Sequence, residues 1–201
     1  MPRLCWPNCA HPASWALAAV LAWALCLPQA LQAQASEPDP ALRALLMQAV
    51  DRSASFEHPF DAEVWLADMS TRLARYLDDP QQRLEFLSLL HAEATLAEVP
   101  PELVLAVIEI ESAFERFAIS HAGALGLMQV MPFWLEEIGR PGDNLFNVQT
   151  NLRFGCTILK YYIDMEKGDL VRALARYNGS LGKTKYPYKV LDALHKRWFR
   201  S

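Results

Sequence analysis

The chain has 201 residues, of which 52% are hydrophobic and 21% charged, and a formal net charge of −4 at pH 7. This length and apolar content are sufficient for one or two domains with a proper hydrophobic core. The mild negative charge argues against a nucleic-acid-binding protein with a strongly basic surface, and 13 prolines and 8 glycines are too few for a disordered or fibrous chain.

Residues 1–35 have the layout of a secretory signal peptide. Arg3 is the only charged side chain in this segment, an uncharged run follows over residues 13–27, and an Ala-Gln-Ala cleavage pattern occupies residues 33–35. A retained transmembrane anchor is the alternative, but the run is shorter than the roughly twenty residues that span a bilayer. A lipoprotein signal ending at Cys26 is disfavoured, because bulky residues precede that cysteine. We expect export to the periplasm, and leave open a peripheral association with the cell wall or membrane.

Cleavage after residue 35 would change the cysteine count and the charge. Of the four cysteines, only Cys156 lies beyond the signal, so the mature chain has no partner for an intramolecular disulfide. The 166 residues that remain of 201 carry a net charge of −5. No later apolar run is long enough to span a membrane, and we expect the mature protein to be soluble.

The chain from residue 40 to about residue 98 shows the periodicity of three helices. The first is expected over residues 41–50. Asp61 is expected to cap the second, and Asp79, followed by Pro80, the third. The apolar stripes of the second and third helices are expected to consist of Trp65, Met69, Leu73, Tyr76 and Leu77, and of Leu84, Leu87 and Leu90.

The remainder of the chain also reads as helices. A helix is expected over residues 102–114, followed by a loop over residues 119–131. Asn147 is expected to cap a long helix that Gly168 ends, with an apolar stripe of Val148, Leu152, Cys156, Leu159, Tyr162 and Ile163. Asp169 is expected to cap a helix to about Tyr177, and a last helix to end near Phe199. We predict a mainly α fold with at most a minor β-hairpin.

Charge is unevenly distributed along the chain. Residues 183–201 hold six lysines and arginines against one acid, Asp192, and therefore carry +5, whereas residues 36–182 carry −10. A solvated helix face is the simpler interpretation of the basic segment. Contact with an anionic polymer or a membrane surface is the alternative.

Several common catalytic patterns are absent from the sequence after residue 35. The histidines occur neither as His-Glu-x-x-His nor beside paired cysteines, so no spacing supports a zinc site. There is no Gly-x-Ser-x-Gly elbow for a serine nucleophile, and residues 123–126 are too short for a phosphate-binding loop. Cys156 is expected to be a buried hydrophobic side chain rather than a nucleophile. We expect no metal and no other cofactor.

Glu111 is the carboxylate that the helical pattern singles out. In the helix over residues 102–114 it falls inside the apolar arc, three residues after Ile108, whereas Glu109 falls near the polar edge. Burial disfavours the charged form of a carboxyl and raises its pKa, which suits a general acid near neutral pH. The alternative is a carboxylate at the rim, whose stem packs while its head reaches water.

Two further segments carry side chains suited to an uncharged polyol polymer. Residues 126–132 read Gly-Leu-Met-Gln-Val-Met-Pro. The glycine permits close approach of the backbone to a ligand. Gln129 is flanked by Met128 before it and by Met131 two residues after it. Residues 175–179 read Ala-Arg-Tyr-Asn-Gly and end a helix with an aromatic ring and an amide. Each segment alone also fits a structural role, as core or as a helix stop.

Taken in order, Glu111-Ser112, the motif at residues 126–132 and Ala-x-Tyr-Asn at residues 175–178 resemble the soluble lytic transglycosylase (SLT) domain, of the glycoside hydrolase family 23 type. The resemblance covers about residues 99–191. It implies a lysozyme-like, mainly helical domain with a long cleft for the glycan strands of peptidoglycan.

The resemblance also implies residue roles. Glu111 matches the single catalytic acid. The implied substrate-binding residues are Ser120, on the acetamido side of a sugar, Gln129 and Met131 in the cleft, and Tyr177 and Asn178, the pair that supports the acid and the substrate. The chain departs from the family pattern at Arg176 and over residues 178–182, and both departures are expected to touch the lip of the cleft.

We divide the chain into a signal peptide over residues 1–35, an N-terminal helical extension over residues 36–98 and the SLT domain over residues 99–201. The extension carries no motif of its own and is a candidate docking element for a partner in the cell envelope.

The implied reaction needs one carboxylate, where ordinary glycosidases use two. Glu111 protonates the oxygen between N-acetylmuramic acid (MurNAc) and N-acetylglucosamine (GlcNAc) while the acetamido oxygen of MurNAc attacks the anomeric carbon. Glu111 then takes the proton of the C6 hydroxyl as a 1,6-anhydro ring closes. Two alternatives remain: a hydrolytic muramidase, for which Asp143 or Asp164 is available as a second carboxylate, and a non-catalytic wall-binding or scaffold module.

Overall fold

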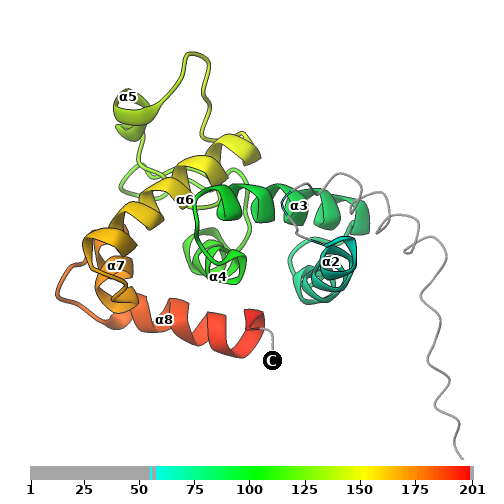
Figure 1. Cartoon of the computed structure of the whole chain (residues 1–201). Coiled ribbons are helices and arrows are strands. Elements are labelled where there is room, and N and C mark those ends of the chain that lie inside the picture. The colour runs from blue at the N-terminus through cyan, green and yellow to red at the C-terminus, as the bar shows by residue number, and fades with distance from the viewer. Residues whose placement is uncertain (1–54, 56–57, 200–201) are drawn as a thin grey trace, which may run out of the picture. The chain divides into compact units, whose positions relative to one another are not determined.

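The structure, a computed structural model, describes residue 55 and residues 58–199. The expected signal segment and the expected helix over residues 41–50 lie outside the described residues. Within them the elements are α2 (Pro59–Leu73), α3 (Pro80–Leu96), α4 (Pro101–Ser112), α5 (Trp134–Ile138), α6 (Val148–Met165), α7 (Leu170–Tyr177), α8 (Lys185–Ala193) and the π-helix η1 (Leu194–Trp198), as Figure 1 shows.

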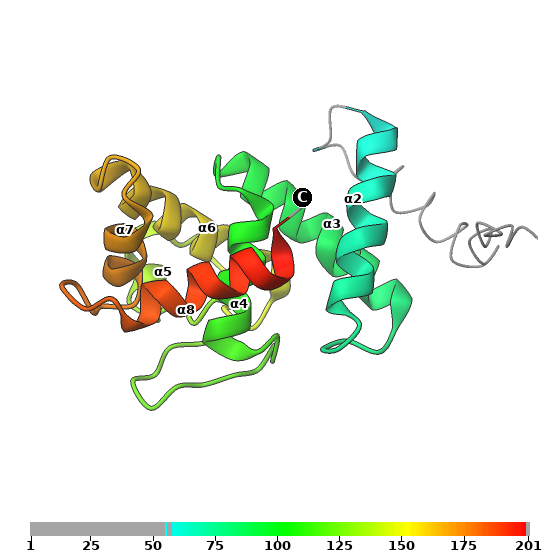
Figure 2. The same ribbon diagram turned by 90° about the horizontal axis from the view of Figure 1, so that it is seen from below.

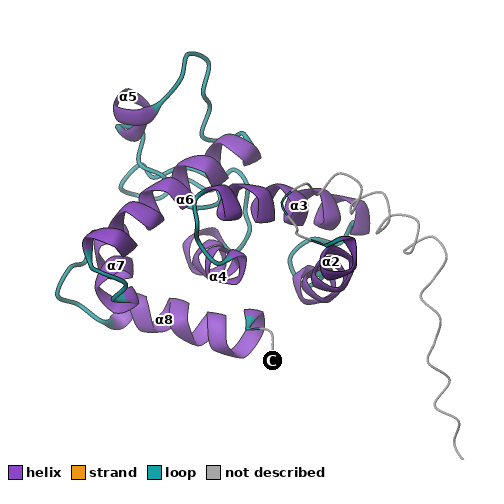
Figure 3. Ribbon diagram, viewed as in Figure 1, coloured by secondary structure: helices purple, strands orange, loops and turns teal. Residues whose placement is uncertain are grey.

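The described part of the chain is mainly α, as the sequence predicts. Figure 3 shows helices joined by loops and no strand among the described residues. The expected minor hairpin is reduced to two isolated β-bridges, Ile119 with Leu125 and Leu125 with Val130. None of the described helices has the length and apolar character needed to cross a membrane.

Three of the four predicted helix caps are confirmed, each a side-chain oxygen that accepts from a backbone N–H of the first turn. They are Asp79 to Gln81 N (2.9 Å), Asn147 to Thr150 N (3.0 Å) and Asp169 to Arg172 N (3.1 Å). The fourth is wrong: α2 begins two residues before Asp61, with His58 as its N-cap residue and Pro59 in the first turn. Proline needs no hydrogen-bond partner for its nitrogen there, and Asp61 instead places negative charge near the positive end of the helix.

The central helix is α4. Its residues 103–108 are all buried, so it is enclosed on every side rather than along one stripe. It packs against α3, α8 and η1; Figure 1 shows it nearly end-on between α3 and α8, and Figure 2 shows α8 running across it. The last turn of this enclosed helix carries Glu111.

α4 ends at Ser112, two residues before the predicted end. Ala113 and Phe114 both adopt left-handed backbone conformations (φ 50° and 66°), which cost of order 1 kcal/mol each for residues with a side chain. Burial of the Phe114 ring offsets this cost. The ring packs against three aromatic side chains, Tyr76 (ring centroids 4.7 Å apart), Phe86 (5.9 Å) and Trp198 (5.6 Å).

The apolar stripes of the sequence largely form the core. Trp65, Met69 and Leu73 of α2 are buried, as are Leu84, Leu87 and Leu90 of α3 and Leu152, Cys156 and Leu159 of α6. Tyr76 and Leu77 pack against this core from beyond the end of α2, and α6 ends at Met165, three residues before Gly168. The short helix α5 was not predicted.

Candidate active site

Glu111 lines a pocket of about 300 Å³ between the end of α4, the turn that joins α7 to α8, and the first turns of α8. Carboxyl, amide, hydroxyl and ammonium groups converge on it. The lining residues are Ile110, Glu111, Asn178, Ser180, Lys183, Lys185, Tyr186 and Lys189.

The pKa of Glu111 is raised to about 7, first of all because burial disfavours the charged carboxylate. Two hydrogen bonds act in the opposite direction by stabilising the ionised form: the Tyr186 hydroxyl donates to Oε1 (2.6 Å), and Asn178 forms the second. The last turn of a helix also carries partial negative charge, which opposes ionisation of a carboxyl there. The raised pKa favours a proton on Glu111 that can be transferred near neutral pH.

Glu109 is less exposed than the sequence predicts. Its side chain is only 10% exposed and lies in an ion pair with Arg197 (2.6 Å) rather than at a polar edge. Trp198 Nε1 donates to the same carboxylate (2.7 Å). Two carboxylates two residues apart are thus distinguished by their partners: Glu109 faces a cation, and Glu111 faces a tyrosine and an amide.

The loop after α4 is held against the helices by buried amide hydrogen bonds. Asn151 of α6, which is 1% exposed, accepts from Met128 N (2.8 Å) and donates to Leu125 O (3.0 Å) and Leu145 O (2.8 Å). Ser112 Oγ donates to Leu127 O (2.8 Å), which joins the residue after Glu111 to the same loop. Because both ends are fixed, the loop keeps a defined position beside the end of α4.

The predicted substrate-binding residues have different surroundings. Asn178 lines the Glu111 pocket, whereas Ser120, Gln129, Met131 and Tyr177 are not among its lining residues.

Three of these four side chains form hydrogen bonds with the backbone of the loop after α4. The Gln129 amide donates to Ala118 O (3.2 Å) and Gly126 O (2.9 Å), Ser120 Oγ accepts from Ala124 N (3.0 Å), and Tyr177 donates to Met128 O (2.7 Å). Met131 is half-buried at the end of the loop. The hydroxyl that reaches the Glu111 carboxyl belongs to Tyr186, not to Tyr177.

Tyr186 is not predictable from the sequence as a site residue, because it stands in a basic segment that resembles a solvated helix face. No local pattern distinguishes it from the exposed Tyr188. Asn151 was also missed, although it carried the same signal as Glu111: a polar residue three positions after Val148, on the apolar stripe of its helix.

Of the two departures from the family pattern, one lies at the Glu111 pocket and the other does not. Arg176 points to Glu166 and forms an ion pair with it, alongside Arg172, at the turn between α6 and α7, and it does not line the pocket. Ser180 does line the pocket, within the departing stretch 178–182.

The two alternative carboxylates are engaged elsewhere. Asp143 forms an ion pair with Arg153 (2.6 Å), and its pKa is lowered, first by a hydrogen bond from the backbone of Arg140 and then by Arg153. Asp164 pairs with Lys160 (2.7 Å), and neither aspartate lines the Glu111 pocket. Within the described ranges, no three His, Cys, Asp or Glu side chains gather as metal ligands would.

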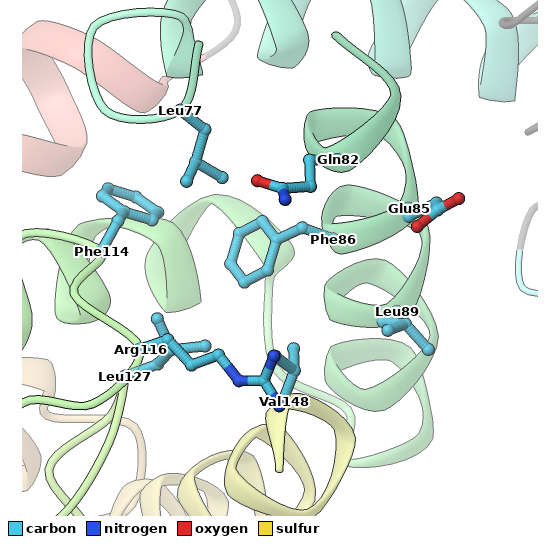
Figure 4. Close-up of a pocket in the computed structure, with 9 residues that line it drawn as sticks. All are labelled: Leu77, Gln82, Glu85, Phe86, Leu89, Phe114, Arg116, Leu127 and Val148. Carbon is cyan, nitrogen blue, oxygen red and sulfur yellow. The ribbon is translucent and has the colours of Figure 1, made fainter. Parts of the chain in front are cut away.

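A second, more apolar cavity of about 260 Å³ lies between α3 and the chain that follows α4. Figure 4 shows Leu77, Phe86 and Phe114 pointing toward one another there, with Glu85 and Leu89 pointing away. Glu111 does not line this cavity.

Comparison with known proteins identifies a family that this chain matches. The model described as the transglycosylase SLT domain matches residues 88–195, more than half of the chain. The transglycosylase of Enterobacteria phage PRD1 is 31% identical over 119 residues, which cover 56% of this chain and 44% of the phage protein. The membrane-bound lytic murein transglycosylase C of Actinobacillus pleuropneumoniae (strain L20) is 44% identical over 48 residues, 24% of this chain and 13% of that protein.

The chain spans less than half the length of these curated relatives. Among solved structures, the 70 kDa soluble lytic transglycosylase of Escherichia coli aligns with 76% of this chain and 29% of its own, at 19% identity and a TM-score of 0.44.

Proposed function

Because the chain belongs to the transglycosylase SLT domain family, we propose that it is a peptidoglycan lytic transglycosylase. It cleaves the β-1,4 bond between MurNAc and GlcNAc and leaves a 1,6-anhydro ring on MurNAc. The observation that carries this proposal is the pocket around Glu111: a carboxyl that accepts a hydrogen bond from Tyr186, lies beside Asn178 and has a pKa raised by burial.

Glu111 acts twice in this reaction. Its proton goes to the glycosidic oxygen, the bond to the anomeric carbon breaks, and the MurNAc acetamido oxygen closes on that carbon. The carboxylate left behind is stabilised by the Tyr186 hydroxyl and by Asn178. It then takes the proton of the C6 hydroxyl, whose oxygen attacks the anomeric carbon, releases the acetamido oxygen and restores protonated Glu111.

A single carboxyl suffices for this cycle, because water does not take part and no second group has to activate it. The positions of Asp143 and Asp164, each in an ion pair and neither lining the pocket, favour this chemistry over two-carboxylate hydrolysis. Ser120, Gln129 and Tyr177 contribute by holding the backbone of the loop after α4, and Asn178 contacts the acid directly.

The same proposal places the protein outside the cytoplasm, where its substrate is found. Residues 1–35 serve as the export signal and residues 99–201 as the catalytic domain. Residues 36–98 are the extension through which a partner in the envelope would bind.

Loss of the Glu111 carboxyl tests the proposal. Glu111→Gln keeps the size and hydrogen-bonding capacity of the side chain but cannot transfer a proton, so cell-wall clearing in a zymogram should fall by about 10² to 10⁴-fold. Glu63→Gln, which changes an exposed carboxylate on α2, is the matched control and should clear like the unmodified protein. Clearing by a folded Glu111→Gln variant at an undiminished rate would reject the assignment.

A further inference from the structure

One wall of the Glu111 pocket is strongly basic. Lys183, Lys185 and Lys189 line it, and the side chains of all three are exposed. Among the described residues they take part in none of the ion pairs, unlike Lys160, which pairs with Asp164, and Lys196, which pairs with Asp192. The wall therefore presents three ammonium groups that no carboxylate of the described chain neutralises.

This arrangement does not favour folding. Lys185 and Lys189 stand one turn apart on the same face of α8, where like charges repel. Lys185 is also the first residue of that helix, next to its positive end, where an acidic side chain would be preferred. Among the residues that the structure describes, Glu111 is the only acid that lines the pocket. An anionic ligand would relieve these repulsions.

The neutral sugar rings of a glycan offer hydroxyls and acetamides, which need no cation. The peptide branches of peptidoglycan carry several carboxylates each, and three ammonium groups on flexible stems suit charges whose positions vary from branch to branch. Resting on the proposed function, we propose that Lys183, Lys185 and Lys189 form a carboxylate-binding wall for the peptide branches, so that the protein prefers peptide-bearing strands to bare ones.

Binding to two forms of one polymer tests this proposal. In the Glu111→Gln background, which leaves the strands intact, the Kd of soluble peptide-bearing strands is compared with that of the same strands after an amidase has removed the peptides. The probe variant changes all three lysines to Gln. Lys196→Gln is the matched control, since it removes an exposed lysine of the same basic segment that does not line the pocket.

The triple variant should bind peptide-bearing strands about 10-fold more weakly at low salt, as three exposed ion pairs of ordinary strength imply. Its Kd should also depend less on salt. The Kd of the bare strands should change less than about twofold, and Lys196→Gln should leave both values unchanged.

An unchanged Kd for peptide-bearing strands would overturn the proposal. An equal loss of affinity for bare strands would also overturn it, because bare strands lack the peptide carboxylates and keep only the lactyl carboxylate of MurNAc. With Glu111 present and the lysines unchanged, the protein should release anhydro products from bare strands. If the protein with all its lysines releases none, the proposed reaction fails, while the Kd comparison still decides the question of the wall.

Discussion

The pKa of the Glu111 carboxyl is set by the opposing effects of burial and of two neighbouring side chains. Burial at the end of α4 raises its pKa to about 7, while the Tyr186 hydroxyl and Asn178 lower it. The balance suits a group that must first give a proton and then take one, because neither form is strongly favoured at neutral pH. Glu109, two residues earlier on α4, is instead held in an ion pair with Arg197 of η1.

The pH dependence of the reaction should report this balance. Since the first step needs protonated Glu111, kcat/KM should be level below pH 7 and fall roughly tenfold for each further unit above it. Tyr186→Phe removes a donor that stabilises the ionised form of Glu111. The bend in the profile, the pH at which kcat/KM begins to fall, should therefore move to higher pH. Rates measured on soluble strands from pH 5 to 9 check both expectations.

Tyr188→Phe is the control for that profile, because Tyr188 is 58% exposed on the same helix. It should leave the bend in place. A bend that moved to lower pH in Tyr186→Phe, or a profile level to pH 9, would contradict the role given to Glu111.

At the scale of elements, the loop after α4 depends on a close approach to α6. Gly126 adopts a positive φ of 74°, and a Cβ there would lie 2.6 Å from Leu145 O and would also overlap Asn151 Nδ2. Both neighbours belong to the hydrogen-bond network that fixes the loop. No residue with a side chain fits this position without displacing that network.

Gly126→Ala should therefore destabilise the fold by more than about 2 kcal/mol, part of it backbone strain and the rest overlap. Gly123→Ala separates the two effects, since Gly123 has a similar φ of 84° but an added Cβ there would meet no atom of the described non-adjacent residues within 4 Å. Its cost should stay near 1 kcal/mol. Urea denaturation of both variants measures the difference, and equal losses would show that the contact with α6 is unimportant.

Local signals predict most of these elements, and non-local contacts account for two of the failures, the end of α4 and the role of Tyr186. The caps at Asp79, Asn147 and Asp169 act within three residues, so the sequence reveals them. The end of α4 depends on packing of Phe114 against Tyr76 and Trp198, which lie far away in the chain. Tyr186 reaches Glu111 across 75 residues and therefore left no local pattern.

At the scale of the described chain, its C-terminal turn ties the first helices to the last. Arg197 and Trp198 of η1 bind Glu109 of α4, and Arg72 of α2 donates to Arg197 O (2.9 Å). The helix that carries Glu111 is thus clamped on the side away from the pocket. The basic segment is accordingly not one solvated face: its lysines are exposed, and Arg197 is partly buried in an ion pair.

Arg197→Met should cost roughly 1 to 3 kcal/mol, because it leaves the Glu109 carboxylate enclosed without its cation. Lys196→Met changes the residue before Arg197 and removes an exposed ion pair with Asp192. It should cost less than about 0.5 kcal/mol. Thermal and urea denaturation provide the comparison. Equal costs would show that the clamp does not stabilise the fold.

The mass of the cleaved product tests the central claim most directly. Purified sacculi are digested with the protein and the released MurNAc-containing fragments are weighed by mass spectrometry. A transglycosylase with Glu111 as its only acid and base should release fragments that end in 1,6-anhydro-MurNAc, lighter by one water than hydrolysed fragments. It should also incorporate no oxygen from isotopically labelled water. Fragments with a reducing MurNAc end that carries the label would contradict the account.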